Sequence, residues 1–524
     1  MESKVVTKVD EDFSVIEFVE EGEETEVPLE LVDKWSRTPP YGYINTSDKF
    51  DIPFNDRIRL AGNQYNQIYQ TRYKLLENSI KTAYFNQNQK PAAEICTLWH
   101  LPDQKSALVI GTIFRKSTKR PSVLVTFDDI EEEDGDVQLT VDENPDELVS
   151  DQDWLELEDS QTQSIRLSGL KLNEFATGMV VGLFGMKMNS EFRVDYVIFP
   201  GPPIDRIPRP VLTNDCFILF LSGIQANTEN ADTWAHRFRR MRAALSAPPY
   251  NNNIERVIVC GNLSVDFCDC SKCTGVSWDD VKHLGATKDS AKNQAYVNIL
   301  DVMANYFVDI TIDLMPGSED PASAMWPQQP LSVALTKKFI FKDGEAEMEE
   351  TEYEEYSTDE EEIFDFMGGS VPRRTTALIN NVPNPYQFEH RGFRFLGTSG
   401  QNVDYLRRMT DSKNHPGVVM EKMIDLCHIC PTAPQAPDCY PFDLQCPDPF
   451  VMENLPHIFF VGNQDKAFSY SREYPGTETS GGEPVEVQFI SVPQSKKTLC
   501  GYVLNLRTME FDAIRIGEDA KTSH

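Results

Sequence analysis

The segment VDITIDLMPGSEDPASAMWPQQPL, residues 308–331, decides how the rest of the chain is interpreted. Apolar and polar residues alternate strictly from Val308 to Leu314, and this period of two predicts a half-buried β-strand. The triplet MPG at 315–317 then ends the strand, because proline and glycine interrupt regular structure. The polar loop 318–321 therefore follows the carboxyl end of a strand, which is where open α/β sheets bind their ligands.

Four other segments also consist of an apolar run that ends in glycine and a small polar residue. They are Cys216–Leu221 before Ser222-Gly223, Val257–Cys260 before Gly261-Asn262, Phe393–Leu396 before Gly397-Thr398, and Ile458–Val461 before Gly462-Asn463. Residues 290–307, just before the central strand, carry apolar residues at helical spacing, which predicts a βαβ unit. We therefore expect an α/β domain over residues 205–516 in which five strand ends converge.

Residues 91–204 have a different sequence pattern, which predicts short strands separated by frequent turns. The expected strands are Ala107–Phe114, Ser122–Phe127, Leu155–Leu157, Ser164–Leu170, Met179–Phe184 and Arg193–Phe199. This pattern predicts a small β-barrel such as an OB-fold. OB-folds often bind single-stranded nucleic acid through a basic groove with exposed aromatic residues, but residues 128–159 are strongly acidic. The sequence therefore favours at most a weak direct nucleic-acid contact here.

The remaining segments are expected to be tails, a helix, a hinge and a loop. Residues 1–44 are acidic and predict a flexible tail, as do residues 517–524, whereas 45–90 predict a helical segment that packs on the core. One side of that helix carries Tyr65, Ile68, Tyr69, Arg72 and Leu75 or Leu76. The Pro-rich stretch 199–210 predicts a domain boundary, and the acidic insert 343–366 predicts a disordered loop by composition.

Composition excludes several classes of protein. The chain has 524 residues, a formal net charge of −34 and eleven cysteines. Such an acidic chain is not expected to present a large surface to nucleic acid or to an anionic membrane, since phosphate binding depends on Lys and Arg. The best basic cluster, HRFRRMR at 236–242, is expected to form a solvated or partner-facing helix. Neither a signal peptide nor a membrane span is evident, so we expect an intracellular protein with reduced thiols.

The converging strand ends resemble those of the calcineurin-like metallophosphoesterases, in which Asp, Asn and His side chains at these places hold two metal ions. In this chain the corresponding positions are Ser222, Asn262, Ser318, Glu319, Asn463 and Asp465, with His428 near another. Serine and neutral asparagine are poor ligands for divalent metals. The resemblance therefore implies a phosphoesterase-like α/β sandwich whose metal site is degenerate, with no catalytic residues, metal or cofactor.

Longer phrases resemble the small, B-type subunits of replicative DNA polymerase delta. They are LMPGSEDPASAMWPQQPL (314–331), FRFLGTSGQNVDYL (393–406), CPTAPQAPDCYPF (430–442), PHIFFVGN (456–463), QYNQIYQTR (64–72) and VIGTIF (109–114). The residues that carry the family motifs are Pro316, Gly317, Asp320, Pro321, Gly397, Thr398, Ser399, Gly400, Gln401 and Asn402.

This resemblance implies an OB-fold joined to an inactive phosphoesterase domain in a non-catalytic, nuclear accessory subunit. Its implied partners are the cysteine-rich C-terminal domain of the polymerase catalytic subunit and a further accessory subunit, and its implied role is to support strand elongation in replication and repair synthesis. Two alternatives stay open, a divergent metal-dependent phosphodiesterase or nuclease and an OB-fold protein that binds single-stranded DNA. The strand-end residues argue against the first alternative, and the net charge argues against the second.

Two groups of cysteines have spacings that zinc sites use. Cys268, Cys270 and Cys273 lie near His283, and Cys427 and Cys430 precede Cys439 and Cys446. The family resemblance argues against structural zinc at both places.

Overall fold

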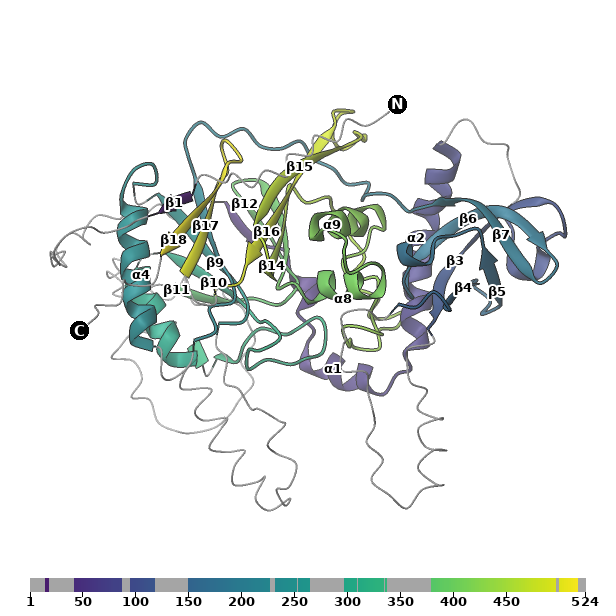
Figure 1. Cartoon of the computed structure of the whole chain (residues 1–524), viewed down its shortest axis with the longest axis horizontal. Helices are drawn as coiled ribbons and strands as arrows, with labels where there is room; N and C mark the ends of the chain where they lie inside the picture. The colour runs from purple at the N-terminus through teal and green to yellow at the C-terminus, as the bar shows by residue number, and fades with distance from the viewer. Residues whose placement is uncertain are drawn as a thin grey trace, which may run out of the picture.

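The structure is a computed structural model that describes residues 15–17, 42–86, 95–117, 149–226, 231–251, 253–263, 296–308, 310–333, 335–336, 378–495 and 499–516. The expected strand 122–127, the first cysteine group with His283, the acidic insert 343–366 and the segment 517–524 lie outside these residues. Figure 1 shows an elongated molecule with a small barrel at one end and a larger body of two sheets and covering helices at the other.

Sheet A has seven strands in the spatial order β1-β18-β17-β8-β9-β10-β11. They are β1 (Val15–Glu17), β8 (Phe217–Leu221), β9 (Ile254–Cys260), β10 (Thr311–Met315), β11 (Leu378–Asn381), β17 (Leu499–Asn505) and β18 (Phe511–Ile516). The neighbours β8, β9, β10 and β11 run parallel, which confirms the βαβ unit that leads into β10. Their carboxyl ends therefore meet at one edge.

Sheet B has six strands in the order β15-β16-β14-β13-β12-β2. They are β2 (Tyr43–Asn45), β12 (Tyr386–His390), β13 (Phe393–Thr398), β14 (Ile458–Gln464), β15 (Phe468–Tyr474) and β16 (Val485–Pro493). The central strands β13, β14 and β16 are parallel, so the ends of β13 and β14 also lie on one edge.

The two sheets pack face to face over an aromatic core. The rings of Phe220 on β8 and Phe460 on β14 have centroids 5.1 Å apart, and Phe388 on β12 stacks on Phe395 of β13 at 4.5 Å. All these side chains are buried, which fits the apolar runs that the sequence places in these strands.

Helices cover the outer face of each sheet. Helix α4 (Ala231–Ser246) and the helix at 296–306 cover sheet A, where Phe238 lies 5.9 Å from Phe307. Helices α8 (Gln401–Met409) and α9 (Pro416–Asp425) cover sheet B. Helix α9 begins at a proline, and the His415 ring accepts a hydrogen bond from the Gly417 N–H, so its start has a proline and a capping side chain. The body is therefore a four-layer sandwich of helices, two sheets and helices.

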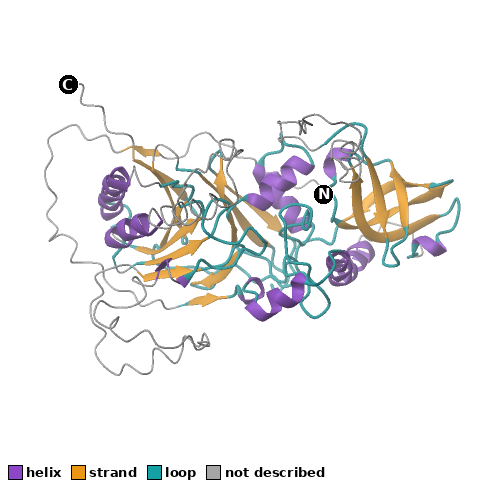
Figure 2. Cartoon of the chain, turned by 90° about the horizontal axis from the view of Figure 1, so that it is seen from below, coloured by secondary structure: helices purple, strands orange, loops and turns teal. Residues whose placement is uncertain are grey.

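The barrel is closed by five strands in the order β3-β4-β5-β7-β6. They are β3 (Ser106–Lys116), β4 (Trp154–Glu158), β5 (Ser164–Ser168), β6 (Val180–Met188) and β7 (Glu191–Ile198). This arrangement fits the expected OB-fold. Helix α2 (Asn66–Asn86) follows the short helix α1 (Phe54–Ala61) and lies between the barrel and the body. Figure 2 shows the same separation of barrel and sheets from below.

Short 3-10 helices also occur within the described residues, at Asp48–Phe50, Leu98–His100 and Leu172–Glu174. None of the helices in the described part of the chain is both long and apolar enough to cross a bilayer.

Three expectations were wrong in detail. The alternating segment at 308–314 predicted a half-buried strand, but β10 lies inside sheet A and is buried on both faces, because the Asp313 carboxylate pairs with Arg256 of β9 (Nη2–Oδ1 2.8 Å). Residues 15–17 and 43–44 of the predicted flexible tail belong to β1 and β2. The single helix expected after residue 56 is two helices, α1 and α2.

Candidate functional site at the strand ends

The five strand ends that the sequence predicts to converge do meet, although they come from two sheets. The key residue is Asn463, at the end of β14 in sheet B. Its backbone N–H donates to the Ser222 hydroxyl (2.7 Å), and its side-chain Nδ2 donates to the carbonyls of Cys260 (2.8 Å) and Ser399 (2.9 Å). Asn463 therefore joins the ends of β8, β9, β13 and β14.

The fifth strand end, after β10, is tied to β9 by the buried carboxylate of Asp320. This carboxylate accepts hydrogen bonds from the backbone N–H groups of Asn262 (2.7 Å), Leu263 (2.9 Å) and Gly317 (2.8 Å). Both carboxylate oxygens are used in this way. Asp320 thus holds two loops together and is not directed at an open site.

The loops after β9 and β10 lie so close that residue 317 has no space for a side chain. A Cβ atom on Gly317 would lie 2.2 Å from the Asn262 Oδ1 atom. That Oδ1 atom accepts the backbone N–H of Glu319 at 3.0 Å, and the Ser318 hydroxyl lies 3.5 Å from it. The MPG phrase of the family motif is therefore explained by close packing against Asn262.

Side-chain amides form a second layer behind these strand ends. Asn384 Nδ2 donates to Gln328 Oε1 at 2.8 Å, and Gln401 Nε2 donates to the same oxygen at 3.0 Å. The Ser399 N–H donates to Asn384 Oδ1 at 3.1 Å, and Thr398 donates to Asn402 Oδ1 at 2.8 Å. The GTSGQN phrase thus connects β13 to helix α8 and to the PQQP segment.

The polar groups at this edge cross-link the strand ends through hydrogen bonds. Its amides and hydroxyls bond to one another and to the backbone, and its buried carboxylate bonds to N–H groups. Among the described residues, the one cluster of three metal-ligating groups lies elsewhere, at Cys216, Glu255 and His390.

Two of the predicted positions do not join this cluster. Asp465 is exposed, and its negative charge contributes to the raised pKa of Asp404, about 6, which results first from burial. His428 is buried in a different network, where its Nε2 lies 3.0 Å from Asp448 Oδ2. Of the seven positions, Ser222, Asn262, Ser318, Glu319 and Asn463 therefore lie together.

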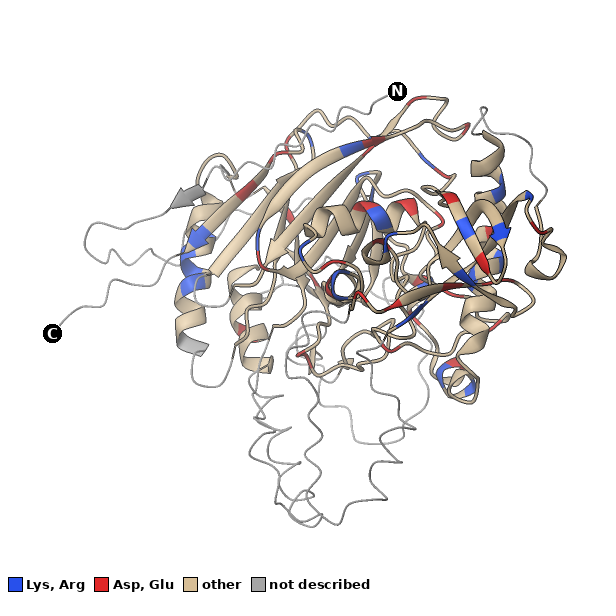
Figure 3. Cartoon of the chain, turned by 45° about the vertical axis from the view of Figure 1, so that its right-hand side comes forward, with Lys and Arg blue, Asp and Glu red and all other residues tan. Residues whose placement is uncertain are grey.

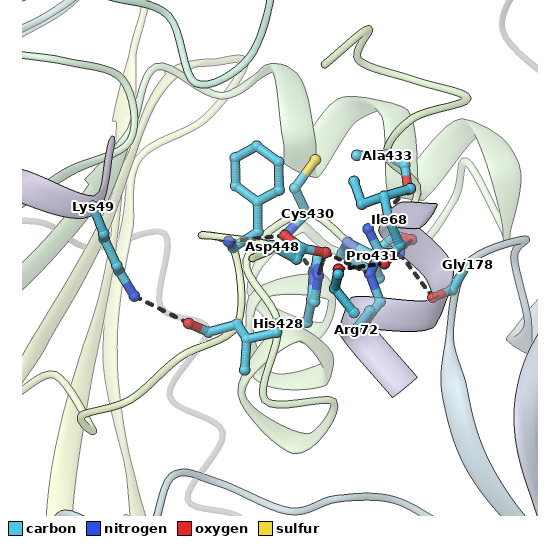
Figure 4. A network of polar contacts seen from close by, with 12 residues as sticks. Lys49, Ile68, Arg72, Gly178, His428, Cys430, Pro431, Ala433 and Asp448 are labelled. Carbon is cyan, nitrogen blue, oxygen red and sulfur yellow. Dashed lines mark hydrogen bonds and ion pairs between the residues drawn. The ribbon is translucent and has the colours of Figure 1, made fainter. Parts of the chain in front are cut away.

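The network around His428 is centred on Arg72, which is fully buried on helix α2. Its Nε donates to Asp448 Oδ2 at 2.7 Å. Its Nη1 donates to the carbonyls of Gly178 (2.9 Å) and Pro431 (2.8 Å), and its Nη2 donates to that of Ala433 (2.9 Å), as Figure 4 shows. Gly178 belongs to the barrel, so one side chain binds α2, the barrel and the body together.

Burial and the neighbouring charges of this network shift the pKa values of Asp448 and His428. Burial alone would raise the pKa of Asp448, but the nearby Arg72 and His428 outweigh burial, and the pKa is lowered well below its usual range. Burial lowers the pKa of His428 to about 4, and the Arg72 charge adds to this effect although Asp448 opposes it. At neutral pH the network is therefore an Arg–Asp ion pair with a neutral histidine.

The cluster of Cys216, Glu255 and His390 joins the two sheets. Cys216 lies just before β8 and Glu255 lies on β9, both in sheet A, whereas His390 ends β12 of sheet B. The ligand atoms lie within 4.8 Å of one another. However, Arg391 binds both oxygens of Glu255, with Nε–Oε2 at 3.0 Å and Nη2–Oε1 at 2.6 Å, and His390 Nε2 lies 2.8 Å from Oε2. Burial would raise the pKa of Glu255, but the hydrogen bonds from His390 and Arg391 lower it to about 2. The geometry is that of an ion-pair network.

The cysteines of the second group do not gather into a metal-binding cluster in the described part of the chain. Cys427, Cys430 and Cys439 are buried, and burial raises the pKa of both Cys427 and Cys430 to about 12. The Cys427 thiol donates to the Met452 carbonyl at 3.2 Å. These thiols are core residues.

Sequence reasoning missed the roles of Asp320, Asn384 and Asp448 in these networks. Their partners lie far away in the sequence, since Asn262 precedes Asp320 by 58 residues and Arg72 precedes Asp448 by 376. One usable signal was Arg72 itself, because an arginine among the apolar positions of a helix requires a buried partner.

Comparison with known proteins agrees with this architecture. The family described as the B subunits of DNA polymerases alpha and epsilon matches residues 218–470, and the family described as the DNA polymerase delta subunit OB-fold domain matches residues 64–197. The first match covers much of the two-sheet body, and the second covers α2 and the barrel.

Full-length relatives carry the same name in distant organisms. The DNA polymerase delta small subunit of Oryza sativa subsp. japonica is 27% identical, with 89% of this chain and 96% of that protein covered. The corresponding protein of Arabidopsis thaliana is 29% identical (89% and 94% covered), and that of Saccharomyces cerevisiae is 26% identical (90% and 93% covered). With both parts of the fold matched and nearly the whole length aligned, this chain is similar along almost its entire length to the DNA polymerase delta small subunits of these organisms.

Proposed function

We propose that this chain is a non-catalytic scaffold subunit that holds the catalytic subunit of DNA polymerase delta through the cysteine-rich C-terminal domain of that subunit, together with a further accessory subunit. Its family supports the role of an accessory subunit of a replicative polymerase. In this role it supports strand elongation in replication and repair synthesis in the nucleus. No lysine-rich import signal is evident in the sequence, which favours entry into the nucleus with a partner.

The observation that carries this proposal is the set of residues at the strand ends and the hydrogen bonds that they form. The four-layer sandwich and its converging loops resemble the calcineurin-like phosphoesterases, where this edge holds two catalytic metals. We interpret Ser222, Asn262, Ser318, Glu319 and Asn463 as former metal-site positions. The side chains of Ser222, Asn262 and Asn463 now bond to backbone groups, and the Asn262 amide oxygen accepts the backbone N–H of Glu319. A sheet edge closed in this way keeps its shape as a scaffold and offers no water-activating centre.

The loss of catalysis is tested by hydrolysis assays. The purified chain is incubated with Mn²⁺ and a nitrophenyl phosphodiester, and with Mn²⁺ and single-stranded DNA. We expect no turnover above the buffer. Turnover that co-purifies with the chain and is lost in an Asp465→Asn, His428→Gln variant would contradict the proposal and favour the divergent phosphodiesterase.

The partner is tested by binding measurements with two forms of the catalytic subunit, one complete and one without its C-terminal cysteine-rich domain. We expect the complete form to bind this chain and the shortened form not to bind it. The isolated cysteine-rich domain should bind the chain in the same stoichiometry. Equal binding of both forms would contradict the proposed contact, even if the chain does belong to the complex.

A further inference from the structure

Charges of both signs are mixed over the surface of this acidic chain. Figure 3 shows the Lys and Arg positions in blue among the Asp and Glu positions in red, in the barrel and in the body. With a formal net charge of −34, the chain as a whole repels anions. An anion would therefore bind only where the fold gathers cationic groups that lack carboxylate partners.

A small cavity in the body brings two cationic side chains together. It lies beside β13, between the 3-10 helix Asp48–Phe50 and the loop 451–456, and both Lys49 and Arg394 line it. Its volume of about 10 Å³ is room for about one water-sized species. Part of its wall is apolar and comes from buried residues such as Ile429 and Met452.

The Lys49 ammonium forms no ion pair with a carboxylate of the described residues. Its Nζ atom donates to the Val451 carbonyl at 3.0 Å, as Figure 4 shows, and lies 5.1 Å from the centroid of the Phe50 ring. An ammonium carries more N–H donors than this one bond uses. Burial lowers the pKa of Lys49, because a desolvated charge is costly, and the charge of Glu453 opposes this effect. An anion next to Nζ would stabilise the charged form.

The Arg394 guanidinium supplies a second donor. Its Nη2 lies 3.1 Å from Asp205 and its Nε lies 3.3 Å from Glu389, so two carboxylates balance its charge on those sides. Its Nη1 atom is buried and has no hydrogen-bond partner among the residues that the structure describes. A buried donor without an acceptor is costly. Nη1 is therefore the group of this side chain that is left for a ligand.

Two neutral amides add further donors to the lining, those of Gln387 and Asn454. Neither side chain forms a hydrogen bond within the described part of the chain, and an amide –NH₂ group can turn toward a bound anion. Of the lining residues, Glu453 carries a carboxylate, but the residue is exposed. The cavity thus offers a charged ammonium, a guanidinium N–H and amide N–H groups to one small ligand.

From these contacts we propose that the cavity is a binding site for one monoatomic anion of the chloride class. Its size excludes phosphate and sulfate, which have several heavy atoms. A water molecule would accept hydrogen bonds from these donors but would leave the Lys49 charge unbalanced, whereas a halide ion does both. The bound anion would connect the 3-10 helix, β13 and the loop 451–456. This inference does not rest on the proposed polymerase function.

The dependence of folding on chloride tests the proposal. The full-length chain is unfolded with urea, because guanidinium chloride would supply the ligand. Chloride is set at about 10 mM and at about 200 mM, and gluconate holds the ionic strength constant. A ligand at one site lowers the unfolding constant by at most the ratio of its concentrations, so we expect a decrease of about three- to twentyfold. No change would overturn the proposal.

Three variants locate the effect. Lys49→Met keeps the length of the side chain without its charge and should remove the chloride dependence. Arg394→Lys keeps a cation for Asp205 and Glu389 but loses Nη1, so it should reduce the dependence, and it tests the site even if Lys49→Met does not fold. Lys171→Met is the matched control, because this side chain is 79% exposed, and it should keep the full dependence. Equal dependence in all the proteins would assign the effect to ions at the surface only and would overturn the proposal.

Chloride NMR measures binding without unfolding the chain. Exchange of chloride with a site on a protein broadens the chloride signal. We expect excess broadening with the full-length chain and with Lys171→Met, a large loss of it with Lys49→Met, and displacement by bromide. Equal broadening by the full-length chain and by Lys49→Met would contradict the assignment to this cavity.

Discussion

At the scale of single residues, the buried ion pair of Arg72 and Asp448 makes the sharpest prediction. Both side chains are at most 1% exposed. The Arg72→Met variant leaves a buried carboxylate without its cation and three carbonyls without their donor. We expect the free energy of unfolding to fall by about 3–5 kcal/mol, as measured by denaturant titration.

The matched control for this prediction is Arg166→Met. Its partner, Glu191, is 43% exposed, and the two charges are 3.5 Å apart on the surface of the barrel. We expect the control to change stability by less than about 0.5 kcal/mol. If both variants lower the free energy of unfolding by the same small amount, the Arg72 network does not hold α2, the barrel and the body together as described.

The pH dependence of stability is a second prediction at this scale. The pKa of His428 is about 4 in the folded chain and about 6.5 in an unfolded one, so between these values the unfolded state binds more protons. Stability is therefore lost as the pH falls through this window. Between pH 7 and pH 5 we expect this residue to account for a loss of about 2 kcal/mol.

The test compares denaturant midpoints at the two pH values in the wild-type chain, in His428→Gln and in His100→Gln. The glutamine amide can still donate to Asp448 but does not titrate, so the His428 variant should lose less stability on acidification. The exposed His100 serves as the control and should leave the wild-type loss unchanged. The same loss in all three proteins would contradict the assignment of a neutral buried His428.

At the scale of elements, the strand-end loops depend on glycine at position 317. A methyl group at this position would lie 2.2 Å from the Asn262 Oδ1 atom, so the loops after β9 and β10 would have to separate. We expect Gly317→Ala to destabilise the chain by about 1–3 kcal/mol, measured by denaturant titration. Gly62→Ala is the control, because the nearest atom to its added methyl group would be 3.6 Å away. An equal effect of both substitutions would contradict close packing at the strand ends.

Elements also show how far the sequence alone could predict the structure. The strands β8, β9, β13 and β14 were predictable because each is an apolar run that ends in glycine, and β10 was predictable because its alternating segment ends at Met-Pro-Gly. The burial of β10 could not be predicted. An aspartate at position 313 of an alternating segment indicates a solvent-facing side chain, and only the structure shows that Arg256 lies beside it on β9. Strand β15 was missed, since SYSRE has few apolar residues and is held as a strand by pairing with β16.

The candidate site shows the same limit. Local sequence patterns predicted that Ser222, Asn262, Ser318 and Asn463 lie at one edge, because the ends of strands follow from apolar runs and from alternation. They could not separate His428 from that edge, since its position depends on Asp448 and on Arg72, which comes from a distant helix. Local periodicity predicts elements, whereas partners across hundreds of residues are fixed only by the packed fold.

At the scale of the whole molecule, cationic side chains in the described part of the chain connect the barrel to the body. Arg72 binds the barrel carbonyl of Gly178, Arg115 of β3 donates to the Met409 carbonyl at 3.3 Å, and Lys422 of α9 donates to the Glu174 carbonyl. Each contact joins a charged side chain to a backbone group of the other part. These contacts therefore hold the barrel and the sandwich in a fixed relation, which the proposed scaffold role requires.

The central claim is that this chain acts by holding a polymerase together. The most direct measurement is processive primer extension by the catalytic subunit of DNA polymerase delta, with and without this chain at equal molar amounts and physiological salt. The account predicts that the two proteins co-purify in equal amounts and that long products disappear when the chain is withheld. Identical product lengths in both reactions, from a chain that binds primer–template tightly by itself, would contradict it.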